Sequence, residues 1–410
     1  MPRRRSYGLT FSAAFNAATA SIALLAAAGC QNGPSDNGCQ IARQVVLPGT
    51  LPLALLPEIQ VERLGPTTIV LGSDASSVRW VSIAMDGTLG TEQSVALPPG
   101  TIRAVYALAG VDAPGDKIIV GALMPAANGT DAELRLVVVP TDGSPAGAAG
   151  DPIATFGGGV GTPPQLAMGT SASGMYAGLA WIAAGQLPKY AFVDGQGQVV
   201  SGASGDVEGG APAPAYSCLG FAPGKAELTV TYQKAPVNDL GPTWFIGDLA
   251  IDGAITTLSL NVAPGASAKM SCASTVLYDN GGSPEYAIVW QDGTGSWLSV
   301  YYGDQVDSVK SFPFASSTDF GGPDLQPLLK GAANFVGKDF GVLFARAHSV
   351  EVWRIDWVGS VRSGVLILPS LEGNVGNVAS ASGPNQLTST YADYTGQDMG
   401  RRLVIDAACY

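Results

Sequence analysis

One short pattern recurs along the 410-residue chain: VSIAMDG at residues 81–87, LVVVPTDG at 136–143, YAFVDG at 190–195 and FIGDLAIDG at 245–253. Each copy is an apolar or alternating strand that ends in Asp-Gly. Degenerate copies end at Gly303-Asp304 and Gly359-Ser360, so the successive intervals are 56, 52, 58, 51 and 56 residues. Asp-Gly supplies the positive φ angles of a tight hairpin turn. The pattern therefore predicts one such hairpin in every unit of about fifty residues.

Further strands complete each unit. We call the recurring strand-and-turn pattern the marker. Strand-like runs precede it at residues 117–121, 286–290 and 340–344, and runs that stop at a proline follow it at 95–98, 258–264 and 365–369. Four short strands in about fifty residues resemble a blade of a β-propeller, whose outermost strand is an edge and tolerates proline. The resemblance covers residues 39–410 and implies an all-β, seven-bladed propeller of four-stranded blades.

Two other all-β folds compete with the propeller. Consecutive β-sandwiches are equally rich in strands, but they do not repeat a single hairpin at this period. A right-handed β-helix has much shorter rungs than fifty residues. The 54 glycines and the low share of charged residues, 13 %, suit any of these all-β folds and do not favour amphipathic helices.

The two ends of the chain each hold part of a unit. Gln44-Val45-Val46-Leu47-Pro48 looks like an outer strand with no unit before it, and residues 401–406 look like a third strand with no successor. We expect the N-terminal strand to pair into the last blade, which completes the seventh unit and closes the ring. The missing hairpin would then lie between Cys409 and Cys39, so these two cysteines are predicted to form a disulfide in its place.

The first thirty residues read as an export signal. Arg3, Arg4 and Arg5 precede an uncharged stretch and the apolar run at 22–28, which is too short to span a membrane stably. The ending Ala27-Ala28-Gly29-Cys30 resembles the lipobox of bacterial lipoproteins, which implies a lipid on Cys30. Ala27 stands where that family usually has leucine, so cleavage by the ordinary signal peptidase is the alternative. Gln31, rather than aspartate, favours the outer membrane.

These features divide the chain into a signal peptide at 1–29, a lipidated cysteine with a flexible tether at 30–38, and one propeller domain at 39–410. With Cys30 acylated, the remaining cysteines form an even set, as expected in an oxidising compartment. Cys218 and Cys272 lie one repeat apart, and each should begin the innermost strand of its unit. We predict a second disulfide between them, joining the fourth and fifth blades.

Composition limits the partners. Without residues 1–29 the chain has 18 basic and 33 acidic residues, a net charge of −15, and no basic run that would bind nucleic acid. With one histidine and no Cys-x-x-Cys pair, the sequence predicts no metal site and no cofactor. The spread of acidic residues is typical of a solubilising surface on a monomer.

No catalytic set stands out. His348 falls between two strands and is a surface loop residue by default. Asp292-Gly293-Thr294-Gly295-Ser296-Trp297 resembles the Asp-box hairpin of sialidase-like propellers, although its glycine is one place late. The carboxylate pairs Asp304 with Asp307 and Asp319 with Asp324 have no spacing that fixes them for glycoside hydrolysis. The seven tryptophans are expected to pack between blades: Trp80, Trp181, Trp244, Trp290, Trp297, Trp353 and Trp357.

Two functions follow as hypotheses. The first is a non-enzymatic lipoprotein that presents a rigid propeller surface to a protein or polysaccharide of the cell envelope, with the membrane held through its lipid anchor. The second is an envelope glycosidase or lyase that uses acidic residues at the mouth of the propeller channel.

Overall fold

The computed structural model is an all-β protein, and no helix occurs in the residues that it describes. Those residues are 40–47, 58–64, 67–84, 88–109, 117–157, 163–213, 216–223, 227–234, 243–261, 272–277, 285–292, 295–302, 310–315, 324–330, 335–346, 349–356, 366–369, 374–383, 386–395 and 400–409. The segments 1–29 and 30–38, with Cys30, and the residue Cys39 lie outside them.

The described strands form seven four-stranded antiparallel sheets, numbered here along the chain. Sheet 1 contains β2 (Glu58–Leu64), β3 (Thr67–Ser73), β4 (Ser77–Ile83) and β5 (Gln93–Ala96). Sheet 2 contains β6 (Arg103–Ala109), β7 (Lys117–Pro125), β8 (Ala132–Pro140) and β9 (Ala154–Phe156). Sheet 3 contains β10 (Gln165–Thr170), β11 (Ala177–Ile182), β12 (Lys189–Val193) and β13 (Val199–Asp206).

The other four sheets repeat this order. Sheet 4 contains β14 (Tyr216–Pro223), β15 (Leu228–Lys234), β16 (Thr243–Leu249) and β17 (Ile255–Asn261). Sheet 5 contains β18 (Cys272–Leu277), β19 (Glu285–Asp292), β20 (Gly295–Tyr302) and β21 (Lys310–Ala315). Sheet 6 contains β22 (Asp324–Lys330), β23 (Phe335–Arg346), β24 (Ser349–Asp356) and β25 (Leu366–Pro369). Sheet 7 contains β26 (Asn374–Gly383), β27 (Gln386–Thr395), β28 (Gly400–Cys409) and the N-terminal strand β1 (Gln40–Leu47).

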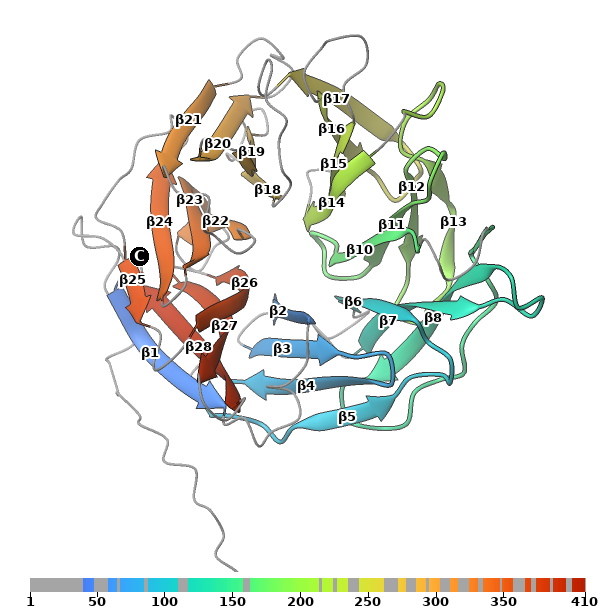
Figure 1. Ribbon diagram of the computed structural model, residues 1–410, viewed down its shortest axis with the longest axis horizontal. Coiled ribbons are helices and arrows are strands. Elements are labelled where there is room, and N and C mark those ends of the chain that lie inside the picture. Colours follow the sequence, from blue (N-terminus) through green and yellow to red (C-terminus); the bar gives the residue numbers. More distant parts are fainter. Residues whose placement is uncertain are drawn as a thin grey trace, which may run out of the picture.

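The sheets are arranged like the blades of a propeller around a common centre (Figure 1). The first strand of a sheet lies nearest the centre and contacts the first strand of the next: β6 with β10, β10 with β14, β14 with β18, β18 with β22, β22 with β26 and β26 with β2. The fourth strand lies on the outer rim. The recurring hairpins are therefore the links between third and fourth strands, as the repeat predicted for the described copies at 142–143, 194–195 and 252–253.

Consecutive sheets pack face to face through apolar side chains. Ile118 of β7 belongs to the core shared with sheet 1, whereas its neighbour Ile119 belongs to the core shared with sheet 3. Successive side chains of a strand point to opposite faces, so both faces of sheet 2 are covered. The other face of sheet 1 packs, through Val61 and Val70, against Ala381 of sheet 7. All six residues of β11 are buried, the near-continuous apolar run of a strand covered on both faces.

The marker turns differ from the tight two-residue form that we expected. At the fourth copy the amide of Gly253 donates to the Ala250 carbonyl at 3.0 Å, and the amide of Ala250 donates to the Ala254 carbonyl at 2.9 Å. Only the glycine has a positive φ, 84°. The loop thus has three residues and is closed by a left-handed glycine. At the third copy the positive φ belongs to Gly197, at 76°, and not to Gly195. The copies at 86–87, 303–304 and 359–360 lie outside the described residues.

The turn glycines also bring neighbouring sheets together. A Cβ built on Gly253 would lie 2.3 Å from the carbonyl oxygen of Gly202 in β13, the outer strand of the preceding sheet. At Gly143 it would lie 2.2 Å from Oε1 of Gln93 in β5, and at Gly197 it would lie 2.4 Å from a methyl group of Val138 in β8. Each turn therefore contacts the sheet before it, and a Cβ added at any of these three glycines would overlap the atom named.

We predict that Gly253→Ala destabilises the protein by about 3 kcal/mol, because it adds a backbone clash to the cost of about 1–2 kcal/mol for a left-handed non-glycine residue. Gly129→Ala is the matched control. Gly129 also has a positive φ, 71°, but no atom lies within 4 Å of its added Cβ, so we expect only about 1 kcal/mol. Urea unfolding midpoints of both variants measure the difference. Equal losses would show that the contact with Gly202 is unimportant.

Candidate functional site

The strand directions give the propeller two distinct faces. On one, which we call the connection face, first and third strands begin and second and fourth strands end, so it carries the links between sheets. The opposite face carries the marker turns and is called the turn face. His348 comes between β23 and β24 in the sequence and lies outside the described part of the chain.

The Asp-box-like stretch forms the β19–β20 hairpin, also on the connection face. Asp292 pairs with Gly295, and Trp290 pairs with Trp297 across the two strands. The stretch is thus a structural hairpin end. Of the carboxylate pairs, Asp304, Asp307 and Asp319 lie outside the described residues, while Asp324 begins β22.

Two of the tryptophans whose side chains are described pack between sheets, as predicted. Trp80 is 2 % exposed in the core between sheets 1 and 2, and Trp181 is 6 % exposed in the core between sheets 2 and 3. Trp244 is also buried. Trp353 is half-buried and its Nε1 donates to Oε2 of Glu351 at 3.1 Å. The side chains of Trp290, Trp297 and Trp357 lie outside the description.

Three of the four remaining cysteines are described, and each lies at or near the end of a strand. Cys218 is the third residue of β14 and Cys272 is the first residue of β18, so both stand at the start of the innermost strand of adjacent sheets. Cys218 is disulfide-bonded. It has a φ of 54°, a positive value for a non-glycine residue, at an irregularity in the pairing of β14 with β15. Cys409 ends β28 and pairs with Gln40 of β1, directly after Cys39 in the sequence.

A buried group of charged and aromatic side chains lies between sheets 3 and 4 at the connection face. Glu208 follows β13 and is 9 % exposed; it forms an ion pair with Lys234, the last residue of β15. The Tyr216 hydroxyl donates to Glu208 Oε1 at 3.2 Å and accepts from the Ala213 amide at 2.8 Å. The Glu208 carboxylate thus has two partners on sheet 4, which ties the loop after sheet 3 to the next sheet.

Aromatic contacts surround this ion pair. The Lys234 ammonium lies 4.4 Å from the centre of the Phe245 ring, a cation–π arrangement. Tyr232 stacks on Phe245 with ring centres 5.1 Å apart and meets Tyr216 edge-on at 5.7 Å. Burial and then the nearby Glu208 carboxylate raise the pKa of Tyr232 far above its usual range. Burial likewise raises the pKa of Tyr216, so both tyrosines keep their hydroxyl protons at neutral pH.

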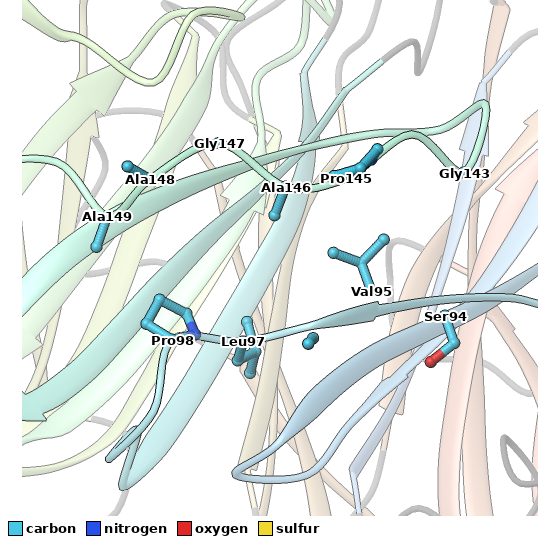
Figure 2. Close-up of a pocket in the computed structure, with 11 residues that line it drawn as sticks. Ser94, Val95, Leu97, Pro98, Gly143, Pro145, Ala146, Gly147, Ala148 and Ala149 are labelled. Atoms are coloured by element: carbon cyan, nitrogen blue, oxygen red, sulfur yellow. The ribbon is translucent and has the colours of Figure 1, made fainter.

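A second feature is a groove on the outer rim between sheets 1 and 2, with a volume of about 490 Å³ and a lining of main-chain groups and small side chains. One wall is residues 94–98, at the end of β5, and the other is Gly143 with residues 145–149, between β8 and β9. Figure 2 shows Val95 and Ala146 pointing toward one another from the two walls. Val95 and Leu97 are buried, and Ala146 and Ala149 pack against the same core. Its size falls within the usual range of ligand pockets.

The side chains that line this rim groove are mostly small. Among its residues only Ser94 has a polar side chain, and most of the second wall is glycine and alanine. Asp142 precedes Gly143 at one end of that wall, and hydrogen bonds from the Ser144 main chain and side chain hold its pKa below the usual value. Main-chain groups therefore lie within reach of an occupant, and a carboxylate stands at the end of the wall.

Two kinds of feature are absent from the described residues. No group of three or more His, Cys, Asp and Glu side chains in them is placed to hold a metal ion. Nor does the described part of the chain include a helix long and apolar enough to cross a membrane.

Comparison with family profiles and with curated protein sequences finds no match. Solved structures do resemble the chain. The β-propeller domain of Nup133 from Vanderwaltozyma polyspora is 11 % identical, aligns over 88 % of this chain and 97 % of its own, and has a TM-score of 0.51. The polysaccharide lyase Uly1 is 10 % identical over 86 % of this chain and 90 % of its own, also with a TM-score of 0.51. An α-L-arabinanase from Penicillium chrysogenum is 10 % identical over 90 % and 98 %, with a TM-score of 0.48.

The similarity to the Nup133 β-propeller domain agrees with the propeller-like arrangement of the four-stranded sheets. At about one identical residue in ten, the similarity shows the fold alone. Unrelated functions share one fold, so a functional conclusion must come from the site itself.

We predict that Lys234→Met destabilises the protein by about 2 kcal/mol, because it leaves the Glu208 carboxylate buried without its cation; this is less than the usual cost because Lys234 is itself 26 % exposed. Lys189→Met is the control, since Lys189 and Asp206 form a pair that is 38 % and 45 % exposed, worth at most about 1 kcal/mol. Denaturant unfolding compares the two variants. Adding Glu208→Gln to Lys234→Met should restore part of the loss, and failure to do so would mean that lost packing, not charge, is responsible.

Proposed function

We propose that the protein is an exported, lipid-anchored lipoprotein whose propeller surface binds a protein or polysaccharide of the cell envelope, without catalysis. The rim groove carries this proposal. Its walls belong to two sheets that share one buried core, so it is a preformed concave surface on a rigid support. Such surfaces bind partners without a large ordering cost.

Export and anchoring rest on the first thirty residues. The basic start, the apolar run at 22–28 and the ending Ala27-Ala28-Gly29-Cys30 support cleavage before Cys30 and acylation of its thiol. Two or three acyl chains hold a soluble domain at a bilayer surface, since each buried methylene is worth about 0.8 kcal/mol. We place the protein at the outer membrane as a monomer, with residues 30–38 as the tether.

We further propose that the seven sheets are the blades of one closed ring, sealed by β1. The supporting observations are the antiparallel pairing of β1 with β28, from Leu47 opposite Leu403 to Gln40 opposite Cys409, and the packing of sheet 1 on Ala381 of sheet 7. In this closure one sheet is built from both ends of the chain. Cys39 immediately precedes the strand that pairs with Cys409, so a disulfide between them would lock the joint.

The second proposed disulfide joins Cys218 to Cys272. Cys218 is disulfide-bonded, the strands β14 and β18 contact each other, and both cysteines stand near the connection-face ends of those strands. The positive φ of Cys218, 54°, is an unusual conformation for a residue with a side chain. A covalent tether to the adjacent sheet would hold it there.

Peptide mapping without reduction tests both disulfides. We expect one cross-linked fragment that contains Cys39 with Cys409 and another that contains Cys218 with Cys272. A fragment joining Cys39 to Cys218 or Cys272 would contradict both pairings and remove the support that the cysteines give to ring closure. Replacement of Cys39 and Cys409 together by serine should lower the unfolding temperature, because it frees the two chain ends.

An envelope binding role predicts a specific partner. The protein, cross-linked in its own outer membrane and purified, should enrich one protein or polysaccharide over a control in which the same signal and lipidated cysteine carry an unrelated soluble domain. Cys30→Ser should release the protein from the membrane fraction and lower the recovery of that partner. No enrichment over the lipidated control would overturn the binding role.

The alternative is an envelope glycosidase or lyase that uses acidic residues at the channel mouth. Release of reducing ends, or of unsaturated sugar products, from charged and neutral polysaccharides decides between the two functions. Turnover by the purified protein, lost on replacing a carboxylate, would establish the enzyme.

A further inference from the structure

In the described part of the chain, no strand pairs with the outer edge of β5, which forms one wall of the rim groove. The Leu97 amide donates to the Ser76 carbonyl at 2.8 Å, and bonded and non-bonded positions alternate along an antiparallel pair. The main-chain groups of Val95 and Leu97 therefore face β4, while those of Ser94 and Ala96 face away from it, along the outer rim. Ser94 and Ala96 are also the exposed residues of β5. This edge offers a short row of donors and acceptors to an extended chain.

The opposite wall does not close that edge. Residues 143–153 run beside β8, but their hydrogen bonds to it are not spaced as in a regular strand pair. The amides of Gly147, Gly150 and Ile153 donate to the carbonyls of Val138, Leu136 and Leu134, respectively. Three residues of the segment thus span two residues of β8. The segment bows outward between these bonds instead of forming a regular fourth strand, which leaves a space between it and β5. The regular strand β9 begins only at Ala154.

Charge adds a second requirement for the occupant. Asp142 lies at one end of the bowed segment and Asp151 at the other, and both are exposed. The residues that line the groove include no lysine or arginine, and the nearby cations Lys117 and Arg135 stand on β7 and β8, where Arg135 donates to the Gly150 carbonyl at 2.8 Å. An occupant with basic residues at both ends of a small apolar stretch would complement this wall.

We propose that the rim groove binds an extended peptide segment of a partner protein, which adds a strand along β5 and inserts small apolar side chains between β5 and residues 143–149. This inference rests on the proposed binding function and names the partner class for it. In strand addition the main-chain bonds supply affinity and alternate side chains supply specificity. The four residues of β5 correspond to a core segment of about 13 Å, at about 3.3 Å per residue.

A peptide fits the groove better than a sugar does. Sugars are held by aromatic platforms and by polar side chains, and this lining provides one serine hydroxyl and no aromatic ring. The glycines and alanines instead allow another backbone to approach closely. Lysines flanking the apolar core would pair with Asp142 and Asp151.

The test uses a fluorescein-labelled peptide in which lysines flank the core Ala-Val-Ala-Val-Ala, and a second peptide with glutamates in place of the lysines. Fluorescence anisotropy with the purified protein should show the lysine peptide binding at least about tenfold more tightly than the glutamate peptide, with the difference shrinking as salt is added. No measurable binding of the lysine peptide, or equal binding of both, would overturn the proposal.

Two protein variants locate the binding site. Ala96→Pro removes an outward amide of β5 without removing a bond to β4, so it should weaken lysine-peptide binding by about tenfold while the protein stays folded. Ser204→Pro is its control. Ser204 is an exposed residue of β13, and the bond from the Val207 amide to the Pro188 carbonyl makes the Ser204 amide face outward in the same way. We expect it to bind the peptide like the unmodified protein.

The outcomes separate this inference from the proposed function. If both proline variants bind the lysine peptide equally well, the peptide binds elsewhere and the groove assignment is wrong. If an envelope partner is still enriched in that case, the binding function stands without the groove. A neutral oligosaccharide that competes with the peptide for the groove, and whose own binding Ala96→Pro removes, would overturn the peptide as its occupant.

Discussion

The face-to-face burial of consecutive sheets is the constraint on which the rest of this structure depends. In sheet 2 the adjacent residues Ile118 and Ile119 are both fully buried, one against sheet 1 and the other against sheet 3. A four-stranded sheet with two apolar faces has no stable existence by itself, so each sheet requires a neighbour on both sides. Polar side chains are still buried within inner strands, among them Thr231 of β15 and Thr390 of β27.

This constraint explains what the sequence could predict. A strand buried on both faces reads as an unbroken apolar run, and a hairpin needs particular residues, so both signals are local and repeat with the unit. The order of four strands, the place of the marker between the third and fourth strands, and the burial of Trp80 and Trp181 all follow from them. The geometry of the marker turns was harder to predict from the sequence. Both Gly195 and Gly197 follow Asp194, and only the pairing of the strands decides which glycine takes the positive φ.

The candidate sites depend on contacts that no local pattern encodes. Glu208 and Lys234 are 26 positions apart in different elements, and nothing in the sequence near either residue indicates that they form an ion pair. Each looks like an ordinary surface charge. Their meeting is a consequence of stacking sheet 3 on sheet 4, which brings the loop after β13 over the end of β15. The sequence near either residue does not predict that proximity, because it arises from the packing of two sheets.

The rim groove has a similar origin in the fit between two segments. In sheet 4 the outer pair is regular, with seven consecutive partners from Thr243 opposite Asn261 to Leu249 opposite Ile255. In sheet 2 the outer pair has only three, from Ala132 to Leu134, and the preceding segment advances three residues for every two of β8. The glycines and alanines of this segment keep the free-energy cost of the irregular pairing low, since they bury little surface and tolerate many conformations. The inner strands must repeat because neighbouring sheets cover them, whereas an outer strand has one free side. Variation in the outer strand is therefore tolerated at the rim without disturbing the core.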